Sequence, residues 1–269
     1  KMNKTLIKIL FYIIIIYIDY MNNLAPEKKF YLNHHKSEQV NRGGKHNFNS
    51  DIKEIYNFSF ANGGRYHIME EVLDKTKEYK LVVEVGCGEC SMLKYYSENY
   101  NFKEIIGYDI AFSNETFEQN TYKNVTLLEG NFNHDYPLQN NSVDCIVMMM
   151  VIEHLFDPFH SFSEIHRVLK KDGLAFVNLP LVTSIKNRLR LLFGNVPVTS
   201  VAYKQWWIVN EWDGNHLHSF SINSIKRLCD KFDLEIVKIS PVGKLVFLKK
   251  IFKSLFCDEI SFCIKKKNA

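Results

Sequence analysis

One decapeptide, LVVEVGCGEC at residues 81–90, constrains the fold more than any other part of the chain. Apolar and β-branched residues run into an acid and then into Gly86-Cys87-Gly88, which predicts a buried strand that ends at a tight turn. Glycine adopts positive φ and has no Cβ, so a ligand can approach the backbone closely there. A helix expected at Ser91–Asn99 would point its N-terminal amides at the same place. The stretch therefore predicts a nucleotide site.

Composition limits the classes of protein to which the chain can belong. Its 269 residues, 46% of them hydrophobic, can bury one full core. The net charge of +4 is small and gives no dense basic face, so we predict no nucleic-acid partner. The six cysteines lack the spacing of a secreted disulfide framework, so we expect reduced thiols and a cytoplasmic protein. The single C-x-x-C, Cys87 and Cys90, lies inside the glycine turn, which favours a turn over a redox or metal site.

Residues 1–20 form an apolar N-terminal segment that we treat as separate from the fold. The nearly unbroken apolar run from Leu6 to Ile18 is shorter than the about 20 residues that a helix needs to span a bilayer. No small-x-small cleavage site follows it. Three interpretations stay open: translated sequence upstream of an in-frame Met21, a short membrane anchor, or a signal peptide.

Strands and helices alternate through the middle of the chain after a polar and helical arm at residues 21–64. Helices are expected at Asp51–Phe58 and Arg65–Lys77, and then the alternation begins. Strands are predicted at Leu81–Gly86, Glu104–Ile110, Val125–Glu129, Val143–Met149 and Leu174–Leu179, with helices at Ser91–Asn99, Asn114–Gln119 and Phe159–Leu169. Such alternation with short connections predicts an α/β domain, residues 65–269, with a mostly parallel sheet covered by helices on both faces.

The pattern changes after Pro180. A helix is expected at Ile185–Phe193, and an insert at about residues 184–220 is rich in aromatic residues and histidines. A helix at Ser221–Lys231 and strands at Leu234–Ser240 and Asp258–Lys265 predict an antiparallel closing hairpin. The segment Lys244–Phe256 is apolar and basic at helical spacing. It either packs on the sheet, which we favour, or lies on a membrane surface.

The glycine turn does not fit a dinucleotide site, because Ser91 stands where G-x-G-x-x-G needs its last glycine. Its acid-x-G-x-G pattern, from Glu84 to Gly88, resembles the class I S-adenosylmethionine-dependent methyltransferases. That resemblance implies a Rossmann-like, seven-stranded sheet with an antiparallel last strand, and S-adenosyl-L-methionine as the cofactor.

Further segments that carry the resemblance follow in order and at matching spacings: Gly107-Tyr108-Asp109, Glu129-Gly130-Asn131-Phe132, Asn140 to Ile146, Val151-Ile152-Glu153-His154-Leu155 and Glu164 to Gly173. The resemblance implies cofactor binding by Glu84, Gly86, Cys87, Gly88, Asp109, Ile110, Asn131, Phe132 and Met148. The acid Asp109 is the family's ligand for both ribose hydroxyls, and a carboxylate can accept both bonds. Purely local roles, in turns or caps, are the alternative for these residues, and Asn131 departs from the family's usual acid.

Methyl transfer to oxygen also needs a proton acceptor, for which histidine is suited near neutral pH. His154 follows the fourth strand, while His216 and His218 lie in the insert. We predict catalytic roles for His154 and His218; the alternatives are a histidine that holds a loop and a hydrogen-bonded structural histidine. Some relatives hold a metal here with two acids and a histidine, but Met150 replaces one acid, so we predict no metal.

The insert itself is similar to the corresponding stretch of MetW-type proteins, which motivates a second hypothesis. The first hypothesis is an S-adenosylmethionine-dependent methyltransferase acting on an oxygen or nitrogen of a small molecule, with a glycan or lipid-linked precursor as one acceptor class. The second is a non-catalytic, cofactor-binding partner protein in amino-acid metabolism. The sequence determines neither the acceptor nor the oligomeric state.

Overall fold

The computed structural model describes residues 59–88, 90–110, 112, 124–200, 216–244 and 246–267. All of them belong to one compact unit, residues 46–269. The apolar segment, most of the arm, the predicted helices at 51–58 and 114–119, and the aromatic stretch at 201–215 lie outside the described residues.

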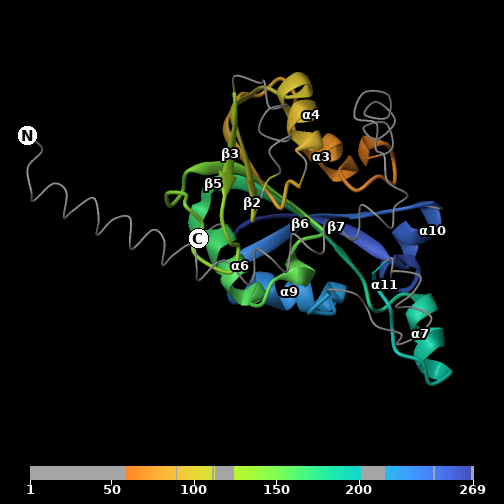
Figure 1. Ribbon diagram of the computed structural model, residues 1–269. Coiled ribbons are helices and arrows are strands. Elements are labelled where there is room, and N and C mark those ends of the chain that lie inside the picture. Colours follow the sequence, from red (N-terminus) through yellow and green to blue (C-terminus); the bar gives the residue numbers. More distant parts are fainter. Residues whose placement is uncertain are drawn as a thin grey trace, which may run out of the picture. The chain divides into compact units, whose positions relative to one another are not determined.

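A seven-stranded mixed sheet forms the centre of this unit (Figure 1). Its strands are β1 (Tyr79–Val85), β2 (Phe102–Asp109), β3 (Val125–Glu129), β4 (Val143–Met149), β5 (Leu169–Pro180), β6 (Leu234–Pro241) and β7 (Glu259–Lys266). Their order is β3-β2-β1-β4-β5-β7-β6; β1 to β5 pair in parallel, and β7 is antiparallel to both of its neighbours. The predicted fold class is confirmed.

Helices cover both faces of the sheet because alternate side chains of each strand point to opposite faces. In β1, Val82 joins the core cluster that contains α3 (His67–Val72) and α4 (Ser91–Asn99), whereas Val83 and Val85 join the cluster of α6 (Pro158–Val168) and α9 (Ile222–Lys231). Three further helices follow strands near the C-terminal part of the chain: α7 (Ile185–Leu192), α10 (Val246–Ile251) and α11 (Lys253–Phe256).

Most of the elements that the structure describes agree with their predicted bounds to within two residues, but three differ more. The helix expected at Arg65–Lys77 is only His67–Val72, because Leu73 is extended and the Asp74 carboxylate accepts bonds from the Thr76 amide and hydroxyl, which forms a turn. Strand β5 begins at Leu169 rather than Leu174, since Leu169 already pairs with Val143 before a bulge. Residues 246–256 form two short helices, where one helical segment was expected at Lys244–Phe256.

Local capping fixes the helices that flank the site. Asp157 accepts bonds from the first two free amides of α6, and Ser221 caps α9 in the predicted position through a capping box with Ser224. At the other end of α6, Glu164 and Arg167 form a two-pronged ion pair at 2.7 and 2.6 Å. None of the helices in the described ranges is both long and apolar enough to span a lipid bilayer.

Candidate cofactor and acceptor site

The glycine loop connects the end of β1 to the first turn of α4, and its two glycines serve different purposes. Both have positive φ, 73° at Gly86 and 54° at Gly88. A Cβ on Gly86 would overlap the Val151 side chain, whereas a Cβ on Gly88 would meet no atom within 4 Å. Gly86 is thus required by packing, while Gly88 keeps one side of the loop open to a ligand. Cys90 caps α4 with a φ of 63°, the conformation that glycine adopts most easily.

Asp109 ties this loop to the neighbouring strand. Its side chain is buried, and its carboxylate accepts one bond from the Gly88 amide and one from the Ile110 amide, each at 2.7 Å. Strands β1 and β2 are parallel neighbours, so Gly88 and Asp109 meet at the same edge of the sheet. A carboxylate has about four acceptor sites, which suits it to bind several donors at once, such as the two hydroxyls of a ribose.

Glu84 carries a buried carboxylate and is the second-last residue of β1, just before the loop. Its Oε1 accepts a bond of 2.9 Å from the Tyr66 hydroxyl. Burial raises the pKa of Glu84 to about 8, although the hydroxyls of Tyr66 and Tyr96 act to lower it. Its Oε2 accepts no hydrogen bond from any part of the chain that the structure describes. A buried, under-satisfied acid beside an open glycine loop fits a ligand that brings donors or positive charge, as a sulfonium nucleoside does.

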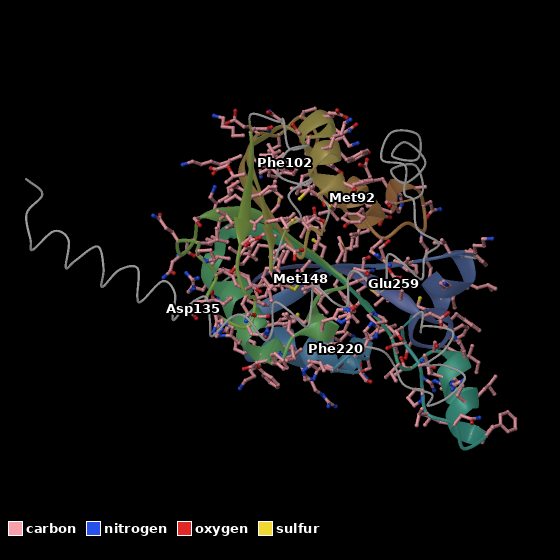
Figure 2. The ribbon with its side chains drawn as sticks, in the orientation of Figure 1. Met92, Phe102, Asp135, Met148, Phe220 and Glu259 are labelled. Carbon is pink, nitrogen blue, oxygen red and sulfur yellow. The ribbon has the colours of Figure 1, made fainter. Side chains whose placement is uncertain are left out.

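Other predicted cofactor residues lie around the ends of β3 and β4. Asn131 is buried and its Oδ1 accepts bonds from the Asn133 amide and side chain, at 3.0 and 2.9 Å. The Phe132 ring packs edge-on against Tyr108 with centroids 4.7 Å apart. Met148 lies fully buried in the core of β4, in register with Val85 (Figure 2).

Cys87 lies half-buried in the loop, with its sulfur 3.7 Å from that of Cys90. Both are free thiols. Burial raises the pKa of Cys87 well above its usual range, so this thiol is not a reactive thiolate at neutral pH. The geometry favours the turn that we predicted for this C-x-x-C.

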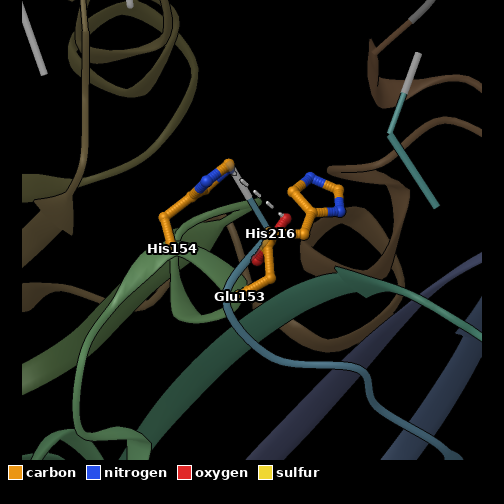
Figure 3. A group of neighbouring side chains, drawn as sticks. All are labelled: Glu153, His154 and His216. Carbon is orange, nitrogen blue, oxygen red and sulfur yellow. Dashed lines mark ion pairs between the residues drawn. The ribbon is translucent and has the colours of Figure 1, made fainter. Parts of the chain in front are cut away.

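Glu153, His154 and His216 form a second group of side chains just past β4 (Figure 3). Glu153 and His154 lie on the short helix η1 (Ile152–His154), and His216 comes from the insert. Glu153 is fully buried, and neither of its carboxylate oxygens has a hydrogen-bond partner among the residues described. The His154 Nε2 lies 4.0 Å from Glu153 Oε1, and the His154 ring meets the His216 ring edge-on at 4.8 Å. Val151, two residues before Glu153, is the residue that packs against Gly86, so this group lies next to the glycine loop.

Backbone hydrogen bonds bring the insert to this place. The Glu153 carbonyl accepts bonds from the amides of Leu217 and His218, at 2.8 and 3.3 Å. They set His216 beside His154, and the Thr199 hydroxyl then holds His216 Nδ1 at 2.7 Å. The sequence suggested His216 as a candidate, but it offered no reason to prefer it to His218.

His218 makes its side-chain contacts with another part of the site. Its Nε2 is 3.2 Å from the Phe156 carbonyl oxygen, to which it donates, and its ring is 6.2 Å from the Phe220 ring. This contact matches the alternative of a hydrogen-bonded structural histidine. Of the insert's two histidines, His216 is the one whose ring contacts His154.

The electrostatics of the Glu153 group suit proton exchange. Burial raises the pKa of Glu153 to about 8, with Arg65 lowering it. Arg65 is itself paired with Glu259 through two bonds of 2.6 and 3.0 Å. One donor atom each of Glu153, His154 and His216 lie within 4.8 Å of one another. Ligands on one zinc-like ion lie roughly 3 Å apart, so these side chains would have to move closer to bind a metal.

Fold and site together define a class I, Rossmann-like methyltransferase. A family model described as a methyltransferase domain matches residues 64–239. The match spans more than half of the chain, which therefore belongs to this methyltransferase family. The resemblance to class I S-adenosylmethionine-dependent methyltransferases is confirmed, and S-adenosyl-L-methionine is the cofactor of that family. The similarity of the insert to MetW-type proteins is not confirmed.

Individual relatives agree with this family. A protein of Mycolicibacterium smegmatis named "Probable S-adenosylmethionine-dependent methyltransferase" is 33% identical over 99 residues, 37% of each chain. One of Mycobacterium tuberculosis with the same description is 28% identical over 130 residues, 47% of this chain and 44% of the relative. The chain thus matches less than half the length of either relative.

Solved structures show the same fold at low sequence identity. A Haloferax volcanii methyltransferase, in complex with the Trm112 methyltransferase activator, aligns with a TM-score of 0.57 at 13% identity, over 82% of this chain and 95% of that one. An S-adenosylmethionine-dependent methyltransferase from Aquifex aeolicus aligns with a TM-score of 0.52 at 16% identity, over 80% and 96%.

Proposed function

We propose that this protein transfers the methyl group of S-adenosyl-L-methionine to an oxygen or nitrogen of a small molecule. The observation that carries the proposal is the pair of bonds that the Asp109 carboxylate accepts from the amides of Gly88 and Ile110. They present a buried carboxylate beside an open backbone loop at the carboxyl edge of a parallel sheet, where such sheets bind nucleosides.

In this proposal the glycine loop and the following strand ends hold the cofactor. Asp109 accepts the ribose hydroxyls, and Gly88 lets the backbone approach the methionine part. The under-satisfied oxygen of Glu84 faces the charged end of the cofactor, and Asn131 and Phe132 contact the adenine. The backbone of Cys87 and Ile110 completes the loop. Met148, buried in β4, supports the site from the core rather than touching the cofactor.

In this proposal Glu153, His154 and His216 activate the methyl acceptor. S-adenosyl-L-methionine supplies an electrophilic sulfonium methyl, so the protein mainly has to align the nucleophile, exclude water and remove a proton. We assign proton removal to His154 and stabilisation of the resulting imidazolium to Glu153, whose Oε1 lies 4.0 Å from His154 Nε2. His216 packs against His154 and orients it. His218 is a positioning residue that holds the Phe156 loop.

A hydroxyl of a glycan or lipid-linked precursor is the acceptor class to test first, because a histidine base suits an oxygen nucleophile. The alternative of a non-catalytic partner protein is not supported over the enzyme by the comparisons. An enzyme and a cofactor-binding partner would both keep the glycine loop, so only a transfer assay separates them.

Two measurements test the proposal. Titration calorimetry of the full chain with S-adenosyl-L-methionine should show one site with micromolar affinity, and no binding well above micromolar concentrations would refute the cofactor assignment. Labelled-methyl transfer to small-molecule extracts should give a product in which the label is bound to oxygen or nitrogen. Binding without any transfer would instead support the partner protein. Cofactor binding and methyl transfer should both be unchanged by EDTA, as expected for a site without a metal.

A further inference from the structure

Helices α10 and α11 leave their apolar side chains in solvent. The sequence led us to expect that this segment packs on the sheet, but none of the residues of α10 or α11 is buried. Phe247 is 76% exposed and Phe252 is 60% exposed. Large apolar side chains exposed next to one another on a monomer usually mark a contact surface.

Helix α7 also leaves apolar side chains exposed, and its hydrogen bonds explain why. Its polar side chains hold the returning chain: Asn187 Oδ1 accepts a bond from the Val198 amide, and Arg190 Nε donates to the Val196 carbonyl. The apolar residues therefore point away from that contact, and Leu192 and Phe193 are 74% and 75% exposed.

Two hydrogen bonds join the chain around α11 to the chain just before α7. The Ser254 hydroxyl in α11 donates to the Thr183 hydroxyl just before α7, at 3.2 Å. The Leu181 amide donates to the Asp258 carbonyl at 2.7 Å. Figure 1 shows α7 next to α11 at the same end of the sheet. We call the exposed and half-buried side chains of residues 185–197, 244 and 246–256 the basic apolar surface.

The charges of this surface all have one sign. Its first segment contains Lys186, Arg188 and Arg190, and its second contains Lys244, Lys249, Lys250 and Lys253. Neither segment contains an aspartate or a glutamate. Phenylalanine and leucine surrounded by cations are typical of surfaces that insert into the headgroup region of anionic bilayers.

We propose that the basic apolar surface docks the protein on an anionic lipid bilayer. The inference goes beyond the proposed function and does not depend on it. Charge complementarity selects this occupant: a second copy of the surface would bring the same cations, and the apolar run at residues 6–18 contains Lys8 and lies two residues after Lys4. Either would be repelled, whereas anionic lipid attracts the lysines and accepts the phenylalanines.

Cosedimentation of the full chain with vesicles tests this inference at about 0.1 M salt, where surface charges are only partly screened. The vesicles contain phosphatidylcholine, with or without phosphatidylglycerol. Wild-type protein should bind the anionic vesicles at least tenfold more strongly than the neutral ones. The double variants Phe247→Ser/Phe252→Ser and Lys186→Gln/Lys250→Gln should each bind the anionic vesicles about tenfold more weakly or worse.

Matched controls carry the same chemical changes elsewhere on exposed positions. Lys80→Gln/Lys171→Gln removes two lysines from the sheet strands, and Val237→Ser removes an exposed apolar side chain from β6. Both should bind vesicles like wild type, and every variant should keep wild-type affinity for S-adenosyl-L-methionine. Equal binding by wild type and the surface variants would overturn the proposal, because the contact would then lie elsewhere, as at residues 6–18. Absent binding to anionic vesicles, or loss of a protein dimer in the surface variants, would overturn it too.

Discussion

The side chain of Val151 fills the space where a side chain on Gly86 would lie. This contact joins the loop after β4 to the glycine loop after β1, and it connects the two halves of the site. Residues that follow Val151 are therefore held at a fixed distance from the cofactor loop, which methyl transfer requires.

The two loop glycines should respond differently to alanine. Gly86→Ala should destabilise the fold by about 2–3 kcal/mol, because the new methyl overlaps Val151 and the φ is positive. Gly88→Ala meets no atom within 4 Å, so it should cost only about 1 kcal/mol of stability and yet weaken cofactor binding strongly. Thermal unfolding and calorimetry measure the two effects.

The double variant Gly86→Ala/Val151→Ala supplies the control for this contact. Removing the valine methyls should recover part of the lost stability, whereas Val151→Ala alone should be destabilising. Additive losses in the double variant would show that the two residues do not compete for this space.

Asp109→Ala should weaken S-adenosyl-L-methionine binding about a hundredfold. It removes the proposed ribose contact and also releases the amides of Gly88 and Ile110 that shape the loop. Calorimetry gives the affinity, and the exposed Asp172→Asn serves as the matched control. An unchanged affinity in Asp109→Ala would remove the ribose assignment.

Glu153→Gln should stabilise the protein at high pH. Burial raises the pKa of Glu153 from 4.5 to about 8, so the folded state holds a proton that the unfolded state releases. Wild-type stability therefore falls as the pH rises from about 4.5 to about 8, and the glutamine variant lacks this loss. We expect the variant to be about 2–4 kcal/mol more stable at alkaline pH and similar to wild type in acid.

Urea unfolding across this pH range measures the difference, with the exposed Glu98→Gln as the control. A stabilisation of Glu153→Gln that is the same at every pH would show that Glu153 is not protonated in the folded protein.

Removal of the His154 ring should abolish proton transfer but not cofactor binding. His154→Gln should lower kcat about a hundredfold with an unchanged affinity for S-adenosyl-L-methionine. In the wild type the rate should rise with pH up to about 8, as Glu153 ionises, and this rise should disappear in Glu153→Gln. Transfer assays at saturating cofactor measure both effects.

The other two histidines separate orientation from chemistry. His216→Gln should lower kcat less than His154→Gln does. His218→Gln should mainly raise KM, because its contact is with the Phe156 carbonyl. Loss of kcat in His218→Gln alone would reverse these assignments and support the catalytic role that the sequence predicts for His218.

Much of the fold could be predicted from patterns within short stretches of the sequence. The periodicity of apolar residues predicted the strand that ends at Val85, the helix that begins at Ser91 and the Ser221 cap, because strand and helix patterns extend over a few residues. The family resemblance implied that Gly88 and Asp109 share one cofactor, and the structure places them in hydrogen-bond contact. Local patterns did not predict the start of β5, because Leu169 is part of that strand through its pairing with Val143 of β4.

The sequence by itself determined the α/β class, the family and the cofactor loop, since these depend on motifs of short range. Only the tertiary structure decided that His216 joins His154 while His218 holds Phe156, because backbone bonds to Glu153 connect segments about 60 residues apart. It also decided that Phe247, Ile251 and Phe252 stay exposed. Helical spacing shows that such a face exists, but only the packing of the whole chain determines whether it is covered.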